Sequence, residues 1–258
     1  MPLLTLSHVY KAFGDPADPL HALQDISFQV RRGEFVCVVG PSGSGKSTLL
    51  RLIAGLLQPT SGVIALDGQP ITRPNPRIGI VFQNSNLMPW RTVLDNVALP
   101  LELRGVARSR RREIAREYIA LVALDGFEGH YPHQLSGGMQ QRAAIARTLA
   151  QNPELLLLDE PFGALDALTR EYLNQELLRI WRLKEMTVIM VTHAINEAVW
   201  LSDRTLALSQ RPGVLKADIP ITLPRPRTEA LLTDPDYLAL VRTVRSYIDR
   251  PVIHKPAL

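Results

Sequence analysis

The sequence is poor in cysteine and lysine and has no long hydrophobic run. Its single cysteine, Cys37, has no partner within the chain, which excludes an intrachain disulfide and favours a reducing compartment. Apolar runs such as the leucines at 155–158 fall far short of the roughly 18 residues that a membrane-spanning helix needs. The N-terminal residues lack the basic stretch and long apolar core of a secretory signal, so we expect none. A role at a membrane is therefore expected to require a partner.

An excess of charge of either sign is also missing. The 29 basic and 25 acidic residues leave a net charge of +4 in 258 residues, so we expect no nucleic-acid partner. Hydrophobic residues make up 46% of the chain, which is enough for a stable core, and the length suits one large domain or a domain with a subdomain. Only five lysines occur, so a lysine inside a motif is informative.

The apolar pattern predicts strands that alternate with helices. Strands are expected at 3–9, 26–30, 34–39, 62–68, 78–83, 155–159 and 187–192, and helices at 48–57, 169–183 and 236–250. Continuous aliphatic strands between helices are typical of a parallel sheet covered on both faces. From about 90 to 150 the spacing is helical, which predicts an α-helical insert. Alternating prolines and arginines at 221–227 predict an extended linker.

The segment GPSGSGKST at 40–48 matches the phosphate-binding pattern G-x-x-x-x-G-K-[ST] between an expected strand and an expected helix. Its glycines let backbone N–H groups curl around a polyphosphate, and the helix N-terminus adds partial positive charge. Lys46 can reach the terminal phosphates, and the hydroxyl of Ser47 can bind Mg²⁺. The alternative, a glycine-rich turn with an exposed lysine, leaves the strand and helix on either side unexplained. The residues expected to bind the nucleotide are Gly40, Pro41, Ser42, Gly43, Ser44, Gly45, Lys46, Ser47 and Thr48.

Further segments distinguish the chain from other P-loop proteins. They are Gln83 at the end of IGIVFQ, LSGGMQQR at 135–142, LLLLDEP at 155–161, GALD at 163–166, and His193 at the end of TVIMVTH. Over residues 3 to about 220 they resemble the Q-loop, signature, Walker B strand, D-loop and switch histidine of the ATP-binding cassette (ABC) ATPases. The resemblance implies ATP and Mg²⁺ as cofactors. It also implies an α/β fold, a P-loop NTPase (RecA-like) core with an N-terminal antiparallel β subdomain and an α-helical insert, followed by a C-terminal linker and helix at 221–258.

The acidic pair after the leucine run suggests the catalytic chemistry. Asp159 ends a buried strand, where a carboxylate is reasonable if it faces a cation, so we expect it to bind Mg²⁺ directly or through water. Glu160 would then point elsewhere and could deprotonate the attacking water, while His193 could hold the γ-phosphate and the water in line. A helix cap is the alternative for this pair. The resemblance adds Gln83 to the catalytic residues, and Gln83 and Ser47 to the Mg²⁺ ligands.

The signature segment is a second phosphate-binding device. Ser136 offers a hydroxyl, and Gly137 and Gly138 offer backbone N–H groups that a ligand can approach closely. A helix is expected to begin just after them, at about Met139, and its N-terminus favours anions. An N-cap with a tight glycine turn is the alternative. In the resembled family this segment completes the ATP site of a partner subunit, so ATP joins two copies head to tail. The resemblance adds the D-loop residue Asp166 to the residues expected to bind ATP.

An aromatic platform for adenine is implied in the N-terminal β region, where the resembled family places it. Phe13 in KAFG best matches that position, and Tyr10 is the alternative. Either side chain could instead belong to the core.

The resemblance implies a membrane-peripheral ATPase on the cytoplasmic face that energises separate transmembrane permease subunits. VFQNSNLMPWRTVLDNV and LPRPR are similar to the importer group for nitrate, sulfonate and taurine, in which a periplasmic solute-binding protein is an indirect partner. Leu87, Met88, Pro89 and Trp90 are candidate permease contacts, and burial within the helical insert is the alternative.

Two other classes of protein fit the sequence less well. An ABC ATPase that acts on nucleic acid or the ribosome usually has two cassettes or a long coiled-coil insertion, whereas this chain has one cassette and no heptad run. A P-loop phosphotransferase gives no reason for LSGGMQQR.

Overall fold

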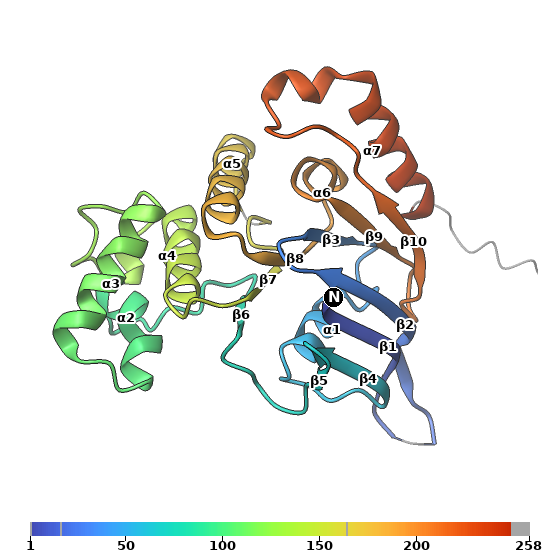
Figure 1. The fold of residues 1–258 in the computed structure, drawn as a ribbon, viewed down its shortest axis with the longest axis horizontal. Coiled ribbons are helices and arrows are strands. Elements are labelled where there is room, and N and C mark those ends of the chain that lie inside the picture. The colour runs from blue at the N-terminus through green and yellow to red at the C-terminus, as the bar shows by residue number, and fades with distance from the viewer. Residues whose placement is uncertain (1, 16, 164, 249–258) are drawn as a thin grey trace, which may run out of the picture.

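The computed structural model describes residues 2–15, 17–163 and 165–248, which form two sheets with helices packed around them (Figure 1). Within these ranges, every helix is too short or too polar to cross a membrane. The expected α/β fold is confirmed. Both sheets help to position the phosphate loop, as described below.

The smaller sheet is antiparallel and has the order β2-β1-β4-β5. Its strands are β1 (Pro2–Phe13), β2 (Leu20–Arg31), β4 (Ser61–Leu66) and β5 (Gln69–Pro70). Residues 26–31 of β2 alternate between buried and exposed, the pattern of a sheet with one face on the core and one on solvent. Its buried face packs in one hydrophobic cluster with helix α1 (Lys46–Ile53), so the sheet supports the helix that follows the phosphate loop.

The larger sheet has the order β10-β9-β3-β8-β7-β6 and is parallel except for the β9–β10 pair. Its strands are β3 (Phe35–Val39), β6 (Ile78–Val81), β7 (Leu155–Asp159), β8 (Thr187–Thr192), β9 (Arg204–Leu208) and β10 (Leu215–Pro220). All residues of β3, β7 and β8 are buried because both faces are covered. In β3, Cys37 packs with the cluster of the later helices, while Val36 and Val38 pack with α1 and the smaller sheet.

The helical insert lies beside the β6 edge of the larger sheet (Figure 1). It consists of α2 (Val93–Leu103), α3 (Arg108–Leu121), the short 3-10 helix η1 (Pro132–Gln134) and α4 (Gly137–Leu149). Helix α4 begins at Gly137, two residues before the expected Met139, because the Ser136 side chain caps it by accepting from the Met139 N–H. The division of the chain into domains at residue 220 stays a prediction.

Other helix boundaries also differ from the sequence pattern. Helix α1 ends at Ile53 rather than at residue 57, because Gly55 has a left-handed φ of +73° and stops the helix. Helix α5 (Ala167–Lys184) is close to the expected 169–183. Helix α7 (Pro235–Ile248) matches the expected last helix, whose residues 249–250 lie outside the described residues.

The pattern did not reveal α6 (Ile195–Leu201), β9 or β10, nor the 3-10 helix η2 (Glu229–Thr233). With seven residues, α6 is too short for a clear helical period. The segment at 221–227 forms no helix or strand and bends at 225–226, and it is docked on α6 through two arginines, so the expected extended linker stays a prediction. Arg225 donates to the carbonyl of Leu201, and Arg227 donates to the carbonyls of Val199 and Trp200.

Candidate nucleotide-binding and hydrolysis site

The candidate site lies where four parallel strands end. In the register of the larger sheet, Val39 pairs with Thr192, and Asp159 pairs with Val191. Strand β6 runs parallel to β7 on its other side. The segments that leave these strands therefore share one edge of the sheet, which is where open α/β sheets place ligands.

The phosphate loop between β3 and α1 needs its glycines for steric reasons. Gly43 and Gly45 have φ values of +77° and +88°, a region that favours glycine. A Cβ on Gly40 would lie 2.9 Å from the carbonyl oxygen of Leu208, and one on Gly45 would lie 2.9 Å from that of Ala22. The loop is thus a bare backbone turn whose N–H groups can approach a bound anion.

Two polar side chains of this loop are buried. Ser44 is fully buried, and within the described residues its hydroxyl has no hydrogen-bond partner, which is what a missing ligand would leave. The ammonium of Lys46 donates to the carbonyls of Gly40 and Pro41, at 2.8 and 3.0 Å. Burial lowers the pKa of Lys46, and the carboxylates of Glu160 and Asp159 oppose that change. A buried ammonium whose hydrogen bonds, within the described residues, go to loop carbonyls can turn to a phosphate oxygen.

Ser47 and Asp159 supply a pair of hard oxygen ligands. The Ser47 hydroxyl donates to Asp159 Oδ1 at 2.9 Å, across the gap between α1 and the end of β7. Burial raises the pKa of Asp159, which is 6% exposed, while the bond from Ser47 opposes the shift. Hydroxyl and carboxylate oxygens fit Mg²⁺, which takes few protein ligands when substrate phosphates supply others. Accordingly, the described residues contain no cluster of three or more acidic, histidine or cysteine side chains that could hold a metal alone.

Glu160 faces His193, the expected switch histidine, whereas Asp159 faces Ser47. Its backbone adopts a φ of +45°, and its N–H donates to the carbonyl of Val191 in β8 at 3.0 Å. This turn sends the Glu160 carboxylate to His193, with 3.1 Å between Oε2 and Nδ1. The alternative of a helix cap is excluded, because α5 starts at Ala167 and its N-cap is Asp166.

Gln83 and Phe13 are both exposed to solvent. Gln83 lies in the bend just after β6, and Phe13 ends β1 with 38% of its surface exposed. The Lys11 ammonium lies 5.0 Å from the centre of the Phe13 ring. Tyr10 is half-buried, so the choice of adenine platform stays a prediction.

The signature and D-loop residues form a second cluster at the starts of α4 and α5. A Cβ on Gly138 would lie 3.2 Å from the side chain of Thr169, whose N–H donates to the Asp166 carboxylate at 3.0 Å. That hydrogen bond lowers the pKa of Asp166. Ser136 and Gly137 are exposed. Across the described ranges, no hydrogen bond or ion pair links residues 136–138 to the phosphate loop.

The structure adds residues that the motifs did not indicate. The loop after β9 lies against the phosphate loop, where Arg211 donates to the carbonyl of Gly43 at 3.4 Å and a Cβ on Gly213 would collide with Ser44. The sequence Arg-Pro-Gly at 211–213, shortly after a buried strand, could have indicated a turn at this place. Next to His193, the hydroxyl of Thr192 donates to the buried carboxylate of Glu197 in α6. No local sequence pattern indicates a role for Glu197.

The fold and this constellation define a P-loop ATPase of the ATP-binding cassette class. The chain belongs to the ABC transporter family, whose model matches residues 23–163.

Known proteins agree with this family assignment. The chain is 45% identical to the nitrate import ATP-binding protein of Synechococcus elongatus, over 95% of this chain and 91% of that protein. It is 46% identical to the aliphatic sulfonates import ATP-binding protein of Bacillus cereus, over 88% of this chain and 89% of that protein. A solved dimeric ATP-binding cassette in a post-hydrolysis state with ADP and Pi superimposes with a TM-score of 0.75 at 37% identity, covering 84% of this chain and 98% of that one.

Proposed function

We propose that this chain is the ATP-hydrolysing subunit of an ABC importer for a small solute of the nitrate, sulfonate or taurine kind. The main support is that Lys46, Asp159 and the Glu160–His193 pair converge at one edge of a parallel sheet. Importer ATP-binding proteins at 45–46% identity over most of the chain support the transport role.

Hydrolysis on this geometry is an in-line attack of water on the γ-phosphorus of ATP. Glu160 accepts the proton of the water, the water oxygen bonds to phosphorus, and the bond to the oxygen bridging the β- and γ-phosphates breaks to leave ADP. His193 hydrogen-bonds to Glu160 and stands at the end of β8, where it can hold the γ-phosphate and the water in line. Gln83 lies at the neighbouring strand end and completes the set.

The remaining polar groups stabilise charge on the transferred group. Ser47 and Asp159 would hold Mg²⁺, with Gln83 as a third candidate ligand, and the bound ion would neutralise charge on the β- and γ-phosphates. Lys46 moves from the loop carbonyls to the phosphates, where its charge is matched. The glycine turn supplies backbone N–H donors for the same oxygens.

A second copy of the chain is the proposed partner in ATP binding. Ser136 caps α4 in the helical insert and Gly137 and Gly138 begin it, close to the start of α5 and without a hydrogen bond or ion pair to the phosphate loop among the described residues. One chain thus presents two anion-binding devices that face separate ligands. A head-to-tail pair would bring the signature of one copy to the ATP of the other, and the dimeric state of the similar solved cassette supports an assembly of two copies.

A rigid loop at 88–92 is the proposed permease contact. Trp90 is 71% exposed, although the loop around it is fixed by the fully buried Asn96. The Asn96 side chain accepts from the N–H of Met88 and donates to the carbonyls of Met88, Arg91 and Thr92. The prediction that Leu87 contacts the permease is wrong, because this side chain is buried in the core. The proposal therefore rests on the exposed indole of Trp90. The chain would then lie on the cytoplasmic face of the membrane, with a periplasmic solute-binding protein as its indirect partner.

The test is purification of the full chain from its native membranes in a mild detergent, followed by mass spectrometry. Wild type should retain a multi-span permease. W90A should lose the permease while it binds ATP as before, because the indole is exposed and outside the core. L183A, which truncates an exposed leucine of α5 on another face, is the matched control and should retain it. Recovery of ribosomal or nucleic-acid proteins without a permease would contradict the transport role.

A further inference from the structure

The His193 side chain has little of its own to hold it in place. Its imidazole is 57% exposed, and the Glu160 carboxylate, itself a reacting group in the proposed mechanism, is its hydrogen-bond partner. The position of the ring therefore depends on the backbone turn from Thr192 to Ala194. A displacement of this turn by about 1 Å is enough to reduce turnover strongly.

The hydroxyl of Thr192 fixes this turn. Thr192 is 2% exposed, and its Oγ1 accepts a hydrogen bond from the N–H of Ala194 at 3.0 Å, across His193. The same Oγ1 lies 2.6 Å from Oε2 of Glu197. A carboxylate can only accept, so the single hydroxyl proton goes to Glu197 and the lone pairs of the hydroxyl stay directed at the Ala194 N–H.

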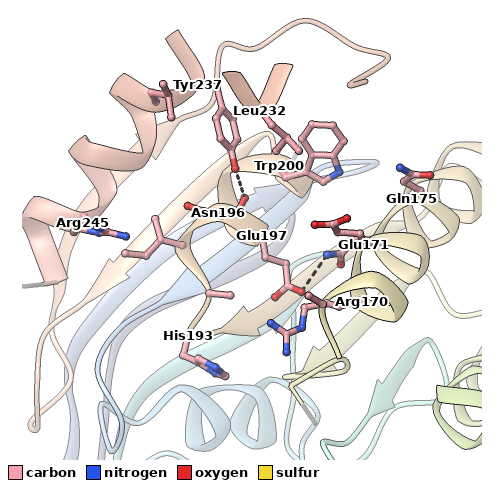
Figure 2. Close-up of a pocket in the computed structure, with 15 residues that line it drawn as sticks. Arg170, Glu171, Gln175, His193, Asn196, Glu197, Trp200, Leu232, Tyr237 and Arg245 are labelled. Atoms are coloured by element: carbon pink, nitrogen blue, oxygen red, sulfur yellow. Dashed lines mark hydrogen bonds between the residues drawn. The ribbon is translucent and has the colours of Figure 1, made fainter. Parts of the chain in front are cut away.

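Glu197 in turn is held by α5. Its other oxygen, Oε1, accepts from the side-chain amide of Asn174 at 3.2 Å. Both residues are more than nine-tenths buried, with exposed fractions of 9% for Glu197 and 7% for Asn174. The bonds run from Asn174 on α5 to Glu197 on α6, then to Thr192 at the end of β8 and to the turn that carries His193. Figure 2 shows His193, Glu197 and Trp200 in sequence along a cavity of about 600 Å³ between α5, α6 and α7.

The chemistry of Glu197 is costly for a purely structural element. Both of its hydrogen bonds come from neutral groups, and in the described part of the chain it forms no ion pair. A buried carboxylate without a cation disfavours folding, and apolar packing between α5 and α6 would serve stability better. What the carboxylate adds is an acceptor that sets the direction of the Thr192 hydroxyl.

We infer that Glu197 is a positioning residue for ATP hydrolysis, which holds the His193 turn through Thr192 and anchors it to α5 through Asn174. This inference rests on the proposed role of His193. Because the D-loop residue Asp166 is the N-cap of α5, the same bonds join the expected dimer surface to the turn beside the γ-phosphate.

The experiment compares steady-state ATP hydrolysis of full-chain variants. T192V, which keeps the shape but loses the hydroxyl, and E197A should both lower kcat by about 10- to 100-fold with KM for ATP unchanged. T192S and E197Q should restore most of the turnover. In E197Q the amide oxygen still accepts from Thr192, and the amide N–H can donate to Asn174 once the Asn174 side-chain amide turns over, which brings its Oδ1, without a partner within the described residues, to the place of Nδ2. The double variant T192V/E197A should be no worse than either single variant, because both interrupt one chain of bonds.

Two controls separate the possible failures. S202A removes a buried hydroxyl at the other end of α6, so it should lower the melting temperature and leave kcat per folded molecule unchanged. If H193A hydrolyses ATP at the wild-type rate, the proposed role of His193 is wrong. If H193A is inactive while T192V and E197A keep the wild-type kcat, only the role of Glu197 is wrong. T192V is the near-isosteric variant that keeps the test valid if E197A fails to fold.

Discussion

At the scale of residues, the site depends on two adjacent carboxylates that face different partners. Asp159 is bonded to Ser47 and Glu160 to His193, although the two are neighbours in the sequence. The left-handed backbone of Glu160, at a φ of +45°, lets the chain turn out of β7 without following the alternation of a strand. One carboxylate thus faces Ser47 and the other faces His193, as their proposed roles in Mg²⁺ binding and water activation require.

The first prediction concerns E160Q. The substitution keeps the shape and the contact with His193 but removes the base, so the variant should bind ATP as wild type does and lose turnover by about 100- to 10,000-fold. Calorimetry with ATP and a single-turnover assay check the two halves of this expectation. Hydrolysis by E160Q at the wild-type rate would remove Glu160 as the base.

At the scale of elements, α6 connects the hydrolysis site to the C-terminal segment. Its first turn is tied to Thr192 through Glu197, and the carbonyls at its last turn accept from Arg225 and Arg227. Tyr237 of α7 adds a third contact by donating to the carbonyl of Asn196 at 3.1 Å. The arginines of segment 221–227 are therefore caps for a short helix, a role that cations take at helix C-termini.

The second prediction concerns Arg227, which is 7% exposed and donates to two helix carbonyls. R227M fills the same space but leaves those carbonyls without their donor, so it should lower the free energy of unfolding by about 1–3 kcal/mol. R242A, at an exposed position on α7, is the control and should change little. Denaturant titration of both variants measures the difference, and equal stability would mean that Arg227 does not hold α6.

At the scale of the whole molecule, four charged side chains join the two sheets. Arg32 and Asp67 follow strands of the smaller sheet, and Arg77 and Glu154 precede strands of the larger one. Arg77 bonds to both acids, and Arg32 does the same. The hydrogen bonds from Arg77 and Arg32 lower the pKa of Glu154 to about 2. A network with several partners is more effective than isolated surface pairs.

The third prediction is a stability change in acid. A carboxylate whose pKa is depressed by folding contributes stability above its unfolded value and loses it as the pH falls through the folded value. For Glu154 this window runs from the ordinary 4.5 down to about 2. E154Q should therefore be less stable than wild type at pH 7, and the difference should shrink as the pH falls through that window. Denaturant midpoints at a series of pH values test this, with E113Q, in an exposed pair on α3, as the control that changes less. A constant difference at all pH values would contradict the assigned role.

The sequence by itself determined the strand–turn–helix around Lys46, the buried aliphatic strands and the order of the motifs. These features are local, because a glycine turn, a run of leucines or the spacing of a motif depends on neighbours along the chain. The tertiary structure alone decided that Ser47 meets Asp159 across 112 positions, that Arg227 caps α6, and that Glu197 holds the turn of His193. Such contacts depend on strand order and helix packing, which bring distant residues together without leaving a period in the sequence.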